Sequence, residues 1–475
     1  MSRIGSMMSV GKQSLANSQA ALQTTSHNVA NVNTEGYSRQ CVEQKAAEPL
    51  GDTRIRIGQG AKVSHVSRVA DTFLNKQIQE ENSKLGTANG RQGALVRVEQ
   101  VYNESINKGL NRFLSNFFNA FREFSNNPES QATRALVKEN SRQLTEDFHR
   151  IHNQLNAIQS DVDMQIKAKV SQINGYAQEI ASLNDKVQLV EYQGVTANDE
   201  RDRRELVLKK LGELVNIRYG EGEGGKIAVT VGNTGVLVSG NEYGQLFTQA
   251  TPADGDKREG NVDVLFRNNE RGSQFTITHE LKGGEIGGAL DIRDKTINEM
   301  HQKIDHIAYT VASTVNQIHE GGYDRYNNTE QSFFIPLTEE FNSAAHIGIH
   351  ENILKDPGLI ASALRPDSPG DNRIANAIAN LQEQPLLNNG KSTIDDFFNG
   401  MVGEFAVVTK RNEMDLEHQK NIVGQLNNIR ESVSGVSLDE ETTDMVKFQK
   451  AFDASARIIK VADEMFDTVL NLKRL

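Results

Sequence analysis

Apolar residues recur every seven positions at both ends of this chain, and this spacing favours long amphipathic helices there. Near the N-terminus one row consists of Met8, Leu15, Leu22 and Val29. A second row, offset by three or four residues, is mostly small or polar and consists of Ile4, Gly11, Ser18, Thr25 and Val32. Such a repeat keeps one helix face turned toward a partner helix, and small side chains in it permit close approach. The sequence therefore predicts an N-terminal helix with a narrow seam.

The C-terminal segment repeats the spacing with larger side chains. Its main row is Leu438, Met445, Phe452, Ile459 and Phe466. A companion row is Phe448, Ser455, Ala462 and Val469. Ser437 precedes three acidic residues, which is typical of a helix N-cap followed by charges that suit the helix dipole. We expect this helix to pair with the N-terminal one as a coiled coil.

Long helices are also predicted between the two ends. One starts at Asn126–Pro128 and continues to about residue 190, and it carries Ile166, Ile173, Ile180 and Val187 seven apart. Further helices are expected over 198–215, from near Gly287 to the Gly321–Gly322 pair, and from about 393 to 432. Shorter helical pieces are expected near 70–85, 91–124 and 371–383.

One region changes to the strand period. Between about 217 and 280 the chain reads as short alternating runs, such as "KIAVTVG" and "VDVLFR", separated by glycine and asparagine. This pattern is typical of antiparallel β structure. The fold class is therefore mainly α with a β-rich insert: a terminal coiled-coil pair, a long-helix bundle stalk and a small outer β domain. The expected divisions are 1–40 with 436–475, 41–195 with 286–435, and 196–285.

Composition narrows the classes of partner. The formal net charge is −11, whereas a nucleic-acid or anionic-membrane partner favours a basic patch. The strongest basic cluster is expected to be a solvated helix face, because its arginines alternate with acids: Glu200, Arg201, Asp202, Arg203, Arg204 and Glu205. No run approaches the roughly 18 apolar residues of a membrane span. We therefore expect neither nucleic-acid binding nor membrane insertion.

The N-terminus has no apolar core of the kind found in a secretory signal peptide, and the single Cys41 forms no internal disulfide. These features indicate the cytoplasm, and they also fit export by a route that reads no cleavable signal.

Candidate catalytic and metal-binding patterns are weak. His346 and His350 are four apart, but the glutamate of a zinc helix is missing and the local alternation favours a strand. The glycines from Gly220 to Gly225 lack the lysine of a phosphate-binding loop. Paired acids lie in helix-forming contexts rather than in any indicated pocket. We expect no catalytic residues, no cofactor and no metal.

The terminal helices are too poor in apolar residues to be stable alone. Burying the first N-terminal row and a few neighbours contributes on the order of 10 kcal/mol. Ordering the backbone costs roughly 1–2 kcal/mol per residue over about thirty residues, and hydrogen bonding recovers only part of it. The wide C-terminal stripe also covers more of its helix than one neighbour hides. We therefore predict that the ends are mobile in the free monomer and ordered on polymerisation.

The stretch "NVANVNTEGYSRQ" follows the N-terminal helix directly. Asn28, Asn31 and Asn33 have side chains that cap carbonyls or tolerate left-handed backbone, and Gly36 allows positive φ. One interpretation is a simple helix C-cap and loop. A contact between subunits, with Tyr37 and Arg39 included, is compatible with it.

Two terminal stretches carry a resemblance. "SHNVANVNTEGYSRQ" is similar to the N-terminal signature of the bacterial flagellar rod, hook and hook-associated axial proteins, and residues 434–472 resemble the C-terminal signature of the same family. The central helices at 287–319 and 369–382 resemble the hook-associated members that form the hook–filament junction. The resemblance covers most of the chain outside the β insert.

This resemblance implies a structural adaptor that joins hook to filament and polymerises through its terminal helices into a ring or tube. It implies unfolded export through the flagellar type III apparatus to the extracellular flagellum. The implied partners are copies of the chain, the hook protein, the second hook–filament junction protein and an export chaperone at the C-terminal helix. Alternatives are a hook- or rod-type axial subunit, a secreted coiled-coil interaction protein, and a wall hydrolase, for which no clustered acid pair is found.

Overall fold

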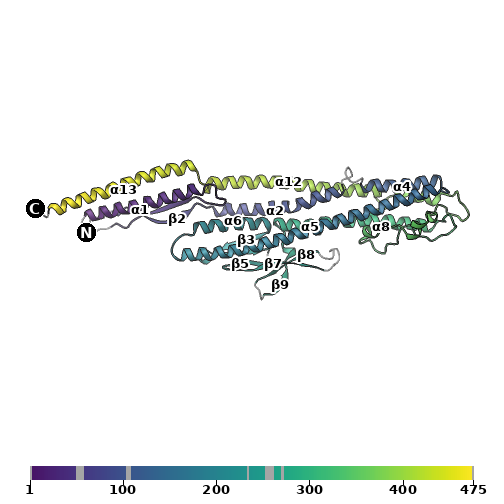
Figure 1. Cartoon of the computed structure of the whole chain (residues 1–475), viewed down its shortest axis with the longest axis horizontal. Coiled ribbons are helices and arrows are strands. Elements are labelled where there is room, and N and C mark those ends of the chain that lie inside the picture. The colour runs from purple at the N-terminus through teal and green to yellow at the C-terminus, as the bar shows by residue number, and fades with distance from the viewer. Residues whose placement is uncertain are drawn as a thin grey trace.

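The protein is described here from a computed structural model that covers residues 3–49, 58–102, 109–232, 235–251, 261–268 and 272–472. The chain forms an elongated rod with both termini at the same end (Figure 1). A pair of terminal helices leads into a longer helical stalk, and the strands of the β insert lie along one side of the stalk. The mainly helical fold with a β insert is confirmed.

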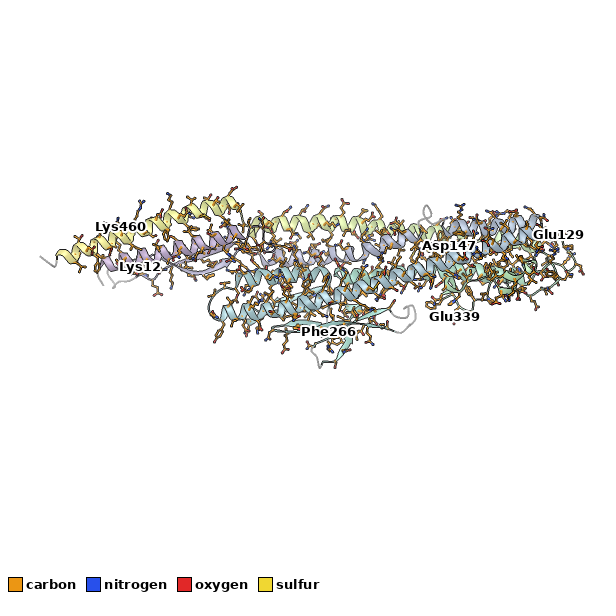
Figure 2. The ribbon with its side chains drawn as sticks, in the orientation of Figure 1. Lys12, Glu129, Asp147, Phe266, Glu339 and Lys460 are labelled. Carbon is orange, nitrogen blue, oxygen red and sulfur yellow. The ribbon has the colours of Figure 1, made fainter. Side chains whose placement is uncertain are left out.

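The terminal pair consists of α1, Arg3–Ala30, and α13, Leu438–Leu472, as the seven-residue rows predict. Figure 2 shows Lys12 of α1 and Lys460 of α13 near the termini, and Glu129 at the far end of the rod. The helices approach closely because their seam contains small residues. A Cβ atom added at Gly11 would lie 2.8 Å from Cγ1 of Ile459, and the hydroxyls of Ser14 and Ser455 are 2.7 Å apart.

A two-stranded hairpin follows α1 and was not predicted. Strand β1, Gln40–Ala46, pairs antiparallel with β2, Ala61–Arg68, with a bulge between Glu43 and Gln44. The hairpin is tied to α1 by Asn17, whose amide donates to the carbonyl of Ala61 and accepts from the N–H of Val63. The strands were missed because most of their side chains are polar and alternate only weakly.

The stalk is built from long helices that share one continuous apolar core. They are α2 (Thr72–Tyr102), α4 (Leu110–Asn126), α5 (Gln131–Tyr192), α6 (Asn198–Leu214), α7 (Gly284–Asp291), α8 (Asn298–Glu320) and α12 (Ile394–Ser434). A π-helical turn, Ile292–Ile297, joins α7 to α8. The long central helices agree with the predictions, except for this turn.

The predicted break between helices at 70–85 and 91–124 is wrong, because α2 runs without interruption through Gly86 and Gly90. A Cβ at Gly86 would collide with the carbonyl oxygen of Glu213, and one at Gly90 with that of Glu285. These glycines permit close backbone approach rather than ending a helix. Residues 103–108 of the second predicted helix lie outside the described residues.

The β insert confirms the antiparallel structure expected between α6 and α7. One sheet has the order β3–β4–β5–β6, with bounds Ile217–Glu221, Ile227–Val231, Gly235–Ser239 and Glu242–Tyr243. The other has the order β7–β8–β9, with bounds Gln245–Ala250, Val262–Arg267 and Gln274–Thr276. Two asparagines of α5 fasten the sheets to the stalk: Asn184 bonds both backbone groups of Ile227, and Asn174 those of Leu246.

The far end of the stalk is closed by loops and short helices between residues 321 and 393. These are α9 (Ser343–His346), α10 (Glu351–Lys355) and α11 (Arg373–Ala379), the last within the predicted 371–383 piece. They cover a cluster of edge-to-face phenylalanine rings, Phe117, Phe121, Phe333 and Phe334. This end therefore has its own dense core.

His319 connects these loops through its ring nitrogens and predicts a pH-dependent contribution to stability. Its ring is fully buried; Nδ1 lies 2.6 Å from the carbonyl oxygen of Gln331, and Nε2 accepts from the N–H of Ala361. Burial lowers the pKa of His319 to about 4. The unfolded chain, with a histidine pKa of about 6.5, therefore binds more protons between pH 6.5 and 4.

His319 alone is consequently expected to lower stability by about 3 kcal/mol as the pH drops through that window. Asp305, whose pKa burial raises to about 6, acts in the opposite direction. In His319→Gln this proton-linked loss is absent, so its melting temperature should fall by less than that of the parent between pH 7 and 4.5, although the variant is less stable at neutral pH. Thermal melts of both proteins across this range check the prediction. His65→Gln, a change at a partly exposed hairpin histidine, is the control. An unchanged pH slope in His319→Gln would contradict it.

Candidate assembly interface

The face of α1 that packs against α13 is the small and polar one. Gly11, Ser18 and Thr25 of the second predicted row are buried, together with Ala21 and Asn28. The apolar row Met8, Leu15, Leu22 and Val29 is only half-buried. Within one molecule, the seam therefore uses the row that permits the closest approach, and the larger side chains remain partly available.

The same division holds on α13. Ser455 and Ala462 of the companion row are buried, while Met445, Phe448, Phe452 and Ile459 are half-buried. Leu438 and the last members of both rows, Phe466 and Val469, are exposed. The single partner α1 therefore covers only part of the stripe.

The last turns of α13 expose the most apolar surface. Six large side chains there have exposed fractions between 37 % and 53 %: Ile458, Val461, Met465, Phe466, Val469 and Leu470. A monomeric protein in water rarely leaves such a continuous apolar face uncovered. This face is therefore the strongest candidate for contact with another molecule.

Asn28 is the centre of the turn that ends α1. It is buried, and its amide group makes four hydrogen bonds within the chain. Nδ2 donates to the carbonyl of Gln40 at 2.9 Å and to Glu441 at 3.1 Å. Oδ1 accepts from the N–H of Gln40 at 3.0 Å and from the Tyr37 hydroxyl at 2.7 Å. Asn28 thus joins the end of α1, the start of β1 and the first turn of α13.

Arg39 makes a second link at this place. Its guanidinium lies 2.8 Å from both Glu440 and Glu441, and Glu441 is almost fully buried. Its backbone N–H donates to the carbonyl of Ser434, the last residue of α12. Burial lowers the pKa of Arg39, but the neighbouring negative groups, Glu441 first among them, together more than offset this and raise it. The guanidinium therefore stays charged, and its bonds to Glu440 and Glu441 hold α13 to the turn.

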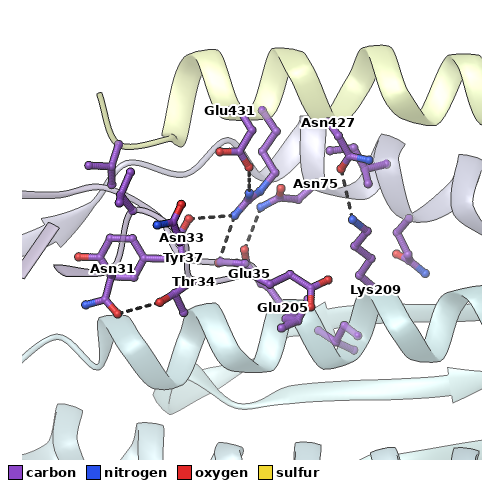
Figure 3. Close-up of a pocket in the computed structure, with 18 of the residues that line it drawn as sticks. Asn31, Asn33, Thr34, Glu35, Tyr37, Asn75, Glu205, Lys209, Asn427 and Glu431 are labelled. Atoms are coloured by element: carbon purple, nitrogen blue, oxygen red, sulfur yellow. Dashed lines mark hydrogen bonds and ion pairs between the residues drawn. The ribbon is translucent and has the colours of Figure 1, made fainter. Parts of the chain in front are cut away.

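The turn also contacts the stalk, as Figure 3 shows with α12 on one side and α6 on the other. The N–H of Ser38 donates to Asp202 of α6, which also binds Arg68 of β2 at 2.8 Å. Arg430 of α12 donates to the carbonyls of Gly36 and Tyr37. These bonds set the angle between the terminal pair and the stalk. We call this meeting point, residues 28–40 with 430–444, Arg68 and Asp202, the joint.

The remaining predicted turn residues lie at the surface of the joint. Gly36 has φ of +82°, and a Cβ there would press on Leu206. The Asn31 amide donates to the carbonyl of His27 and accepts from Thr34, which is the predicted C-cap role. Asn33 is exposed. The structure thus uses Asn28, Gly36, Tyr37 and Arg39 within one subunit.

The basic cluster at 200–205 corrects the prediction of a solvated helix face. Asp202 and Arg204 are buried, and Arg204 donates to Asn184 and to the carbonyl of Gly225. Burial raises the pKa of Asp202 even though Arg68 opposes that shift. Sequence reasoning missed Asp202 and Arg68 because their partners are more than a hundred residues away in the chain.

The described residues contain no group of three or more metal-ligating side chains. Instead, His350 accepts from the N–H of Asn352 at the start of α10, and His346 ends α9, where a strand had been expected. Within the same described ranges, no helix has the length and apolar character needed to cross a bilayer.

Comparison with known proteins gives family matches along the chain. Residues 95–334 match the flagellar hook-associated protein FlgK helical domain. Residues 8–37 match the flagella basal body rod protein family, and 431–472 match the C-terminal family of the flagellar basal body rod FlgEFG proteins. The two terminal matches coincide with the helices that meet at the joint.

Whole-length relatives agree. The chain is 28 % identical to flagellar hook-associated protein 1 of Bacillus subtilis, over 98 % of this chain and 97 % of the relative. It is 23 % identical to that of Escherichia coli, over 99 % and 100 %. Among solved structures, the flagellar hook junction protein FlgK from Burkholderia pseudomallei superposes with a TM-score of 0.68 at 14 % identity, covering 75 % of this chain and 100 % of that one. The last comparison supports the fold.

Proposed function

The chain belongs to the flagellar hook-associated protein FlgK family, and from this premise we propose that it is a structural adaptor that joins the flagellar hook to the filament. In this role it polymerises through its terminal helices. Its location is the hook–filament junction of the bacterial flagellum, reached by type III export. The function is structural rather than catalytic.

The observation that carries this proposal is the apolar face at the end of α13. Six large side chains remain exposed after α1 has packed against the helix. Covering them with neighbouring subunits contributes roughly 4–8 kcal/mol per subunit, if about half of each side chain is buried anew. The half-buried row Met8, Leu15, Leu22 and Val29 adds to this surface. The assembly interface therefore includes the predicted rows of both terminal helices.

The molecule divides, in this proposal, into three parts. Residues 1–40 with 436–475 form the assembly part, 41–195 with 286–435 the helical stalk, and 196–285 the outer β insert together with α6, the helix that leads into it and packs in the stalk. The 28–40 turn of the joint connects the terminal pair to the stalk. Its contacts lie within one subunit, and in this proposal it also contacts a neighbouring subunit.

The proposed partners are copies of the chain, assembled in a ring or tube, together with the hook protein and the second hook–filament junction protein. The exposed apolar face of α13 also needs a cover before assembly, because such surfaces promote aggregation. An export chaperone bound at the C-terminal helix supplies that cover in this proposal. The family of the chain supports these partners at the level of flagellar axial assembly.

Hydrogen exchange tests the proposal directly. In the free chain, amides of residues 3–30 and 445–472 are expected to exchange at least about a hundredfold faster than those of α5, because the terminal pair shares few buried apolar side chains. In assembled protein the same amides should become protected. The internal control is the stretch of α5 from Leu144 to Ile166, whose core-facing side chains are buried and whose exchange should stay constant.

Full protection of both terminal helices in a dilute monomer would contradict the proposed coupling of order to assembly. Failure of the terminal amides to gain protection in assembled particles would contradict the proposed interface.

A further inference from the structure

The turn between α5 and α6 carries an exposed apolar patch that the proposed function does not use. Leu189, Tyr192 and Val195 have exposed fractions of 65 %, 90 % and 59 %. Tyrosine at such exposure adds a large, rigid contact surface at low entropic cost, and it is enriched where proteins bind one another. We call these three residues the α5–α6 patch.

A second apolar patch lies where α12 passes into α13. Ile429, Val433 and Leu438 have exposed fractions of 50 %, 47 % and 48 %. Ile429 and Val433 are one helical turn apart and therefore share a face of α12. Leu438 follows them across the short connection at Gly435. We call these three residues the α12–α13 patch.

The two patches lie at the same level of the rod and on opposite edges. In Figure 1, α12 runs along one edge of the stalk, and the end of α5 lies at the other edge, with α2 and α6 between them. Both patches are at the end of the stalk that adjoins the terminal pair. They therefore cannot meet within one molecule, and two molecules that stand side by side in the same orientation bring these two edges together.

We propose that the α5–α6 patch of one subunit binds the α12–α13 patch of the next copy. Such a contact joins two different surfaces, and repeated around an axis it closes a ring. This inference rests on the proposed function and adds to it a lateral contact outside the terminal seam. It also gives the ring a direction, since each subunit uses one patch on each side.

The surroundings of the patches favour a second copy as the occupant. Each apolar centre has exposed amide or hydroxyl side chains beside it, Gln188 and Gln193 on one and Gln425, Asn428 and Ser432 on the other. The nearby charges Glu191 and Arg430 already bind Arg201 and Glu431 within the chain. Exposed Asp185 and Lys186 flank the first patch with opposite charges, and exposed Asp439 and Glu440 follow Leu438 at the edge of the second, so the apolar centres themselves are uncharged.

The α12–α13 patch is continuous with the terminal helices, and this is a further reason to expect a second copy of the chain as its partner. The α12–α13 patch is followed along α13 by exposed Val446 and then by the apolar face at its end. Three side chains on each side are too few for a stable interface, which needs roughly 800 Å² per partner. The contact therefore works only in a molecule that is already held beside its neighbour by the terminal helices.

Disulfide trapping tests the contact in the full-length protein. Cys41 is first changed to serine, and Tyr192→Cys is combined with Ile429→Cys in one chain. On mild oxidation of assembled particles, at least half of the chains are expected to enter a ladder of dimers, trimers and larger species. Each single variant should give no ladder. The matched control is Met164→Cys with Ile429→Cys, because Met164 is as exposed as Val195 but lies about 42 Å from Tyr192 along α5.

Three outcomes would overturn the inference. One is assembly of the Tyr192→Cys and Ile429→Cys protein without a ladder, which leaves the proposed function standing. Another is that Tyr192→Cys alone forms dimers and the double variant gives no ladder, because this result would show that two α5–α6 patches contact each other. The third is an equal ladder from the Met164 control. If the Cys41→Ser parent does not assemble at all, the proposed function fails, and the lateral contact fails with it.

Charge exchange gives a second test that needs no oxidation. Tyr192→Glu and Ile429→Lys are each expected to slow assembly at least about tenfold, because each leaves a charge against an apolar patch. The two changes together should recover part of that loss, since the carboxylate introduced in one copy then meets the ammonium group introduced in the next. If the assembly rate of the double variant is reduced by the product of the two single reductions, the two patches do not contact each other.

Discussion

Replacing Phe466, Val469 and Leu470 by aspartate is expected to abolish assembly while the stalk melts as before. All three side chains are exposed at the end of α13, so the substitutions remove little packing from the monomer. In the assembled state each new carboxylate meets an apolar neighbour, and an unpaired charge in such an interface costs several kcal/mol. Three of them exceed the roughly 4–8 kcal/mol that this face contributes. Sedimentation and electron microscopy of the purified protein measure the loss.

The matched control places three aspartates at the other end of the rod, in Ile335→Asp, Phe341→Asp and Leu354→Asp. These side chains are exposed to a similar extent, so the added charge and lost apolar area are comparable. This control variant should assemble normally. Assembly of the α13 variant at the parent's rate and concentration would remove the apolar face from the interface.

At the joint, Arg39→Ala is expected to detach the terminal pair from the stalk. The substitution leaves the Glu441 carboxylate buried without its guanidinium partner, and it also removes the links to Glu440 and Asp444. Breaking a buried pair from one side typically costs about 3–5 kcal/mol. The free energy of local opening at residues 28–46 and 438–444 should fall by about this amount, while α5 keeps its protection. Hydrogen exchange of the two segments measures it.

A second change separates the charge from the fold. Glu441→Gln removes the negative charge and keeps an oxygen that accepts from Asn28, so Arg39→Ala combined with Glu441→Gln should be less open than Arg39→Ala alone. Arg142→Ala is the control, because Arg142 also binds two glutamates but lies on an exposed helix face. It should leave exchange unchanged. Equal effects of Arg39→Ala and Arg142→Ala would show that the joint does not depend on its buried pair.

The helical plan of the molecule follows closely from the sequence. The periodic rows around Ile166 and Ile180, the N-cap before α13 and the glycines after Glu320 each predict an element that the structure contains. These signals are local: a period of 3.5 to 3.6 residues fixes which side chains share a face, whatever that face later contacts. The family signatures at residues 26–40 and 434–472 are read from the sequence in the same way.

The sequence of a single helix does not identify which of its rows lies deepest against the partner helix. The sequence predicts a narrow seam that contains both the Leu15 and Leu22 row and the Gly11 and Ser18 row, and the structure buries Gly11 and Ser18 more deeply. The reason is that two helices gain most by approaching closely where side chains are small, provided that larger ones can pack beside the seam. A single helix read alone does not show which of two adjacent rows its partner will take.

The helical nature of the two chain ends therefore followed from the sequence, since amphipathic periodicity is a property of a segment. The tertiary structure alone decided the joint. Asp202, Arg68 and Ser434 approach the 28–40 turn from distant parts of the chain, and the burial of Asp202 reverses the solvated role that its charged neighbours indicate. The energy of an ion pair depends on solvent exposure and distance, and neither quantity exists until the helices have packed.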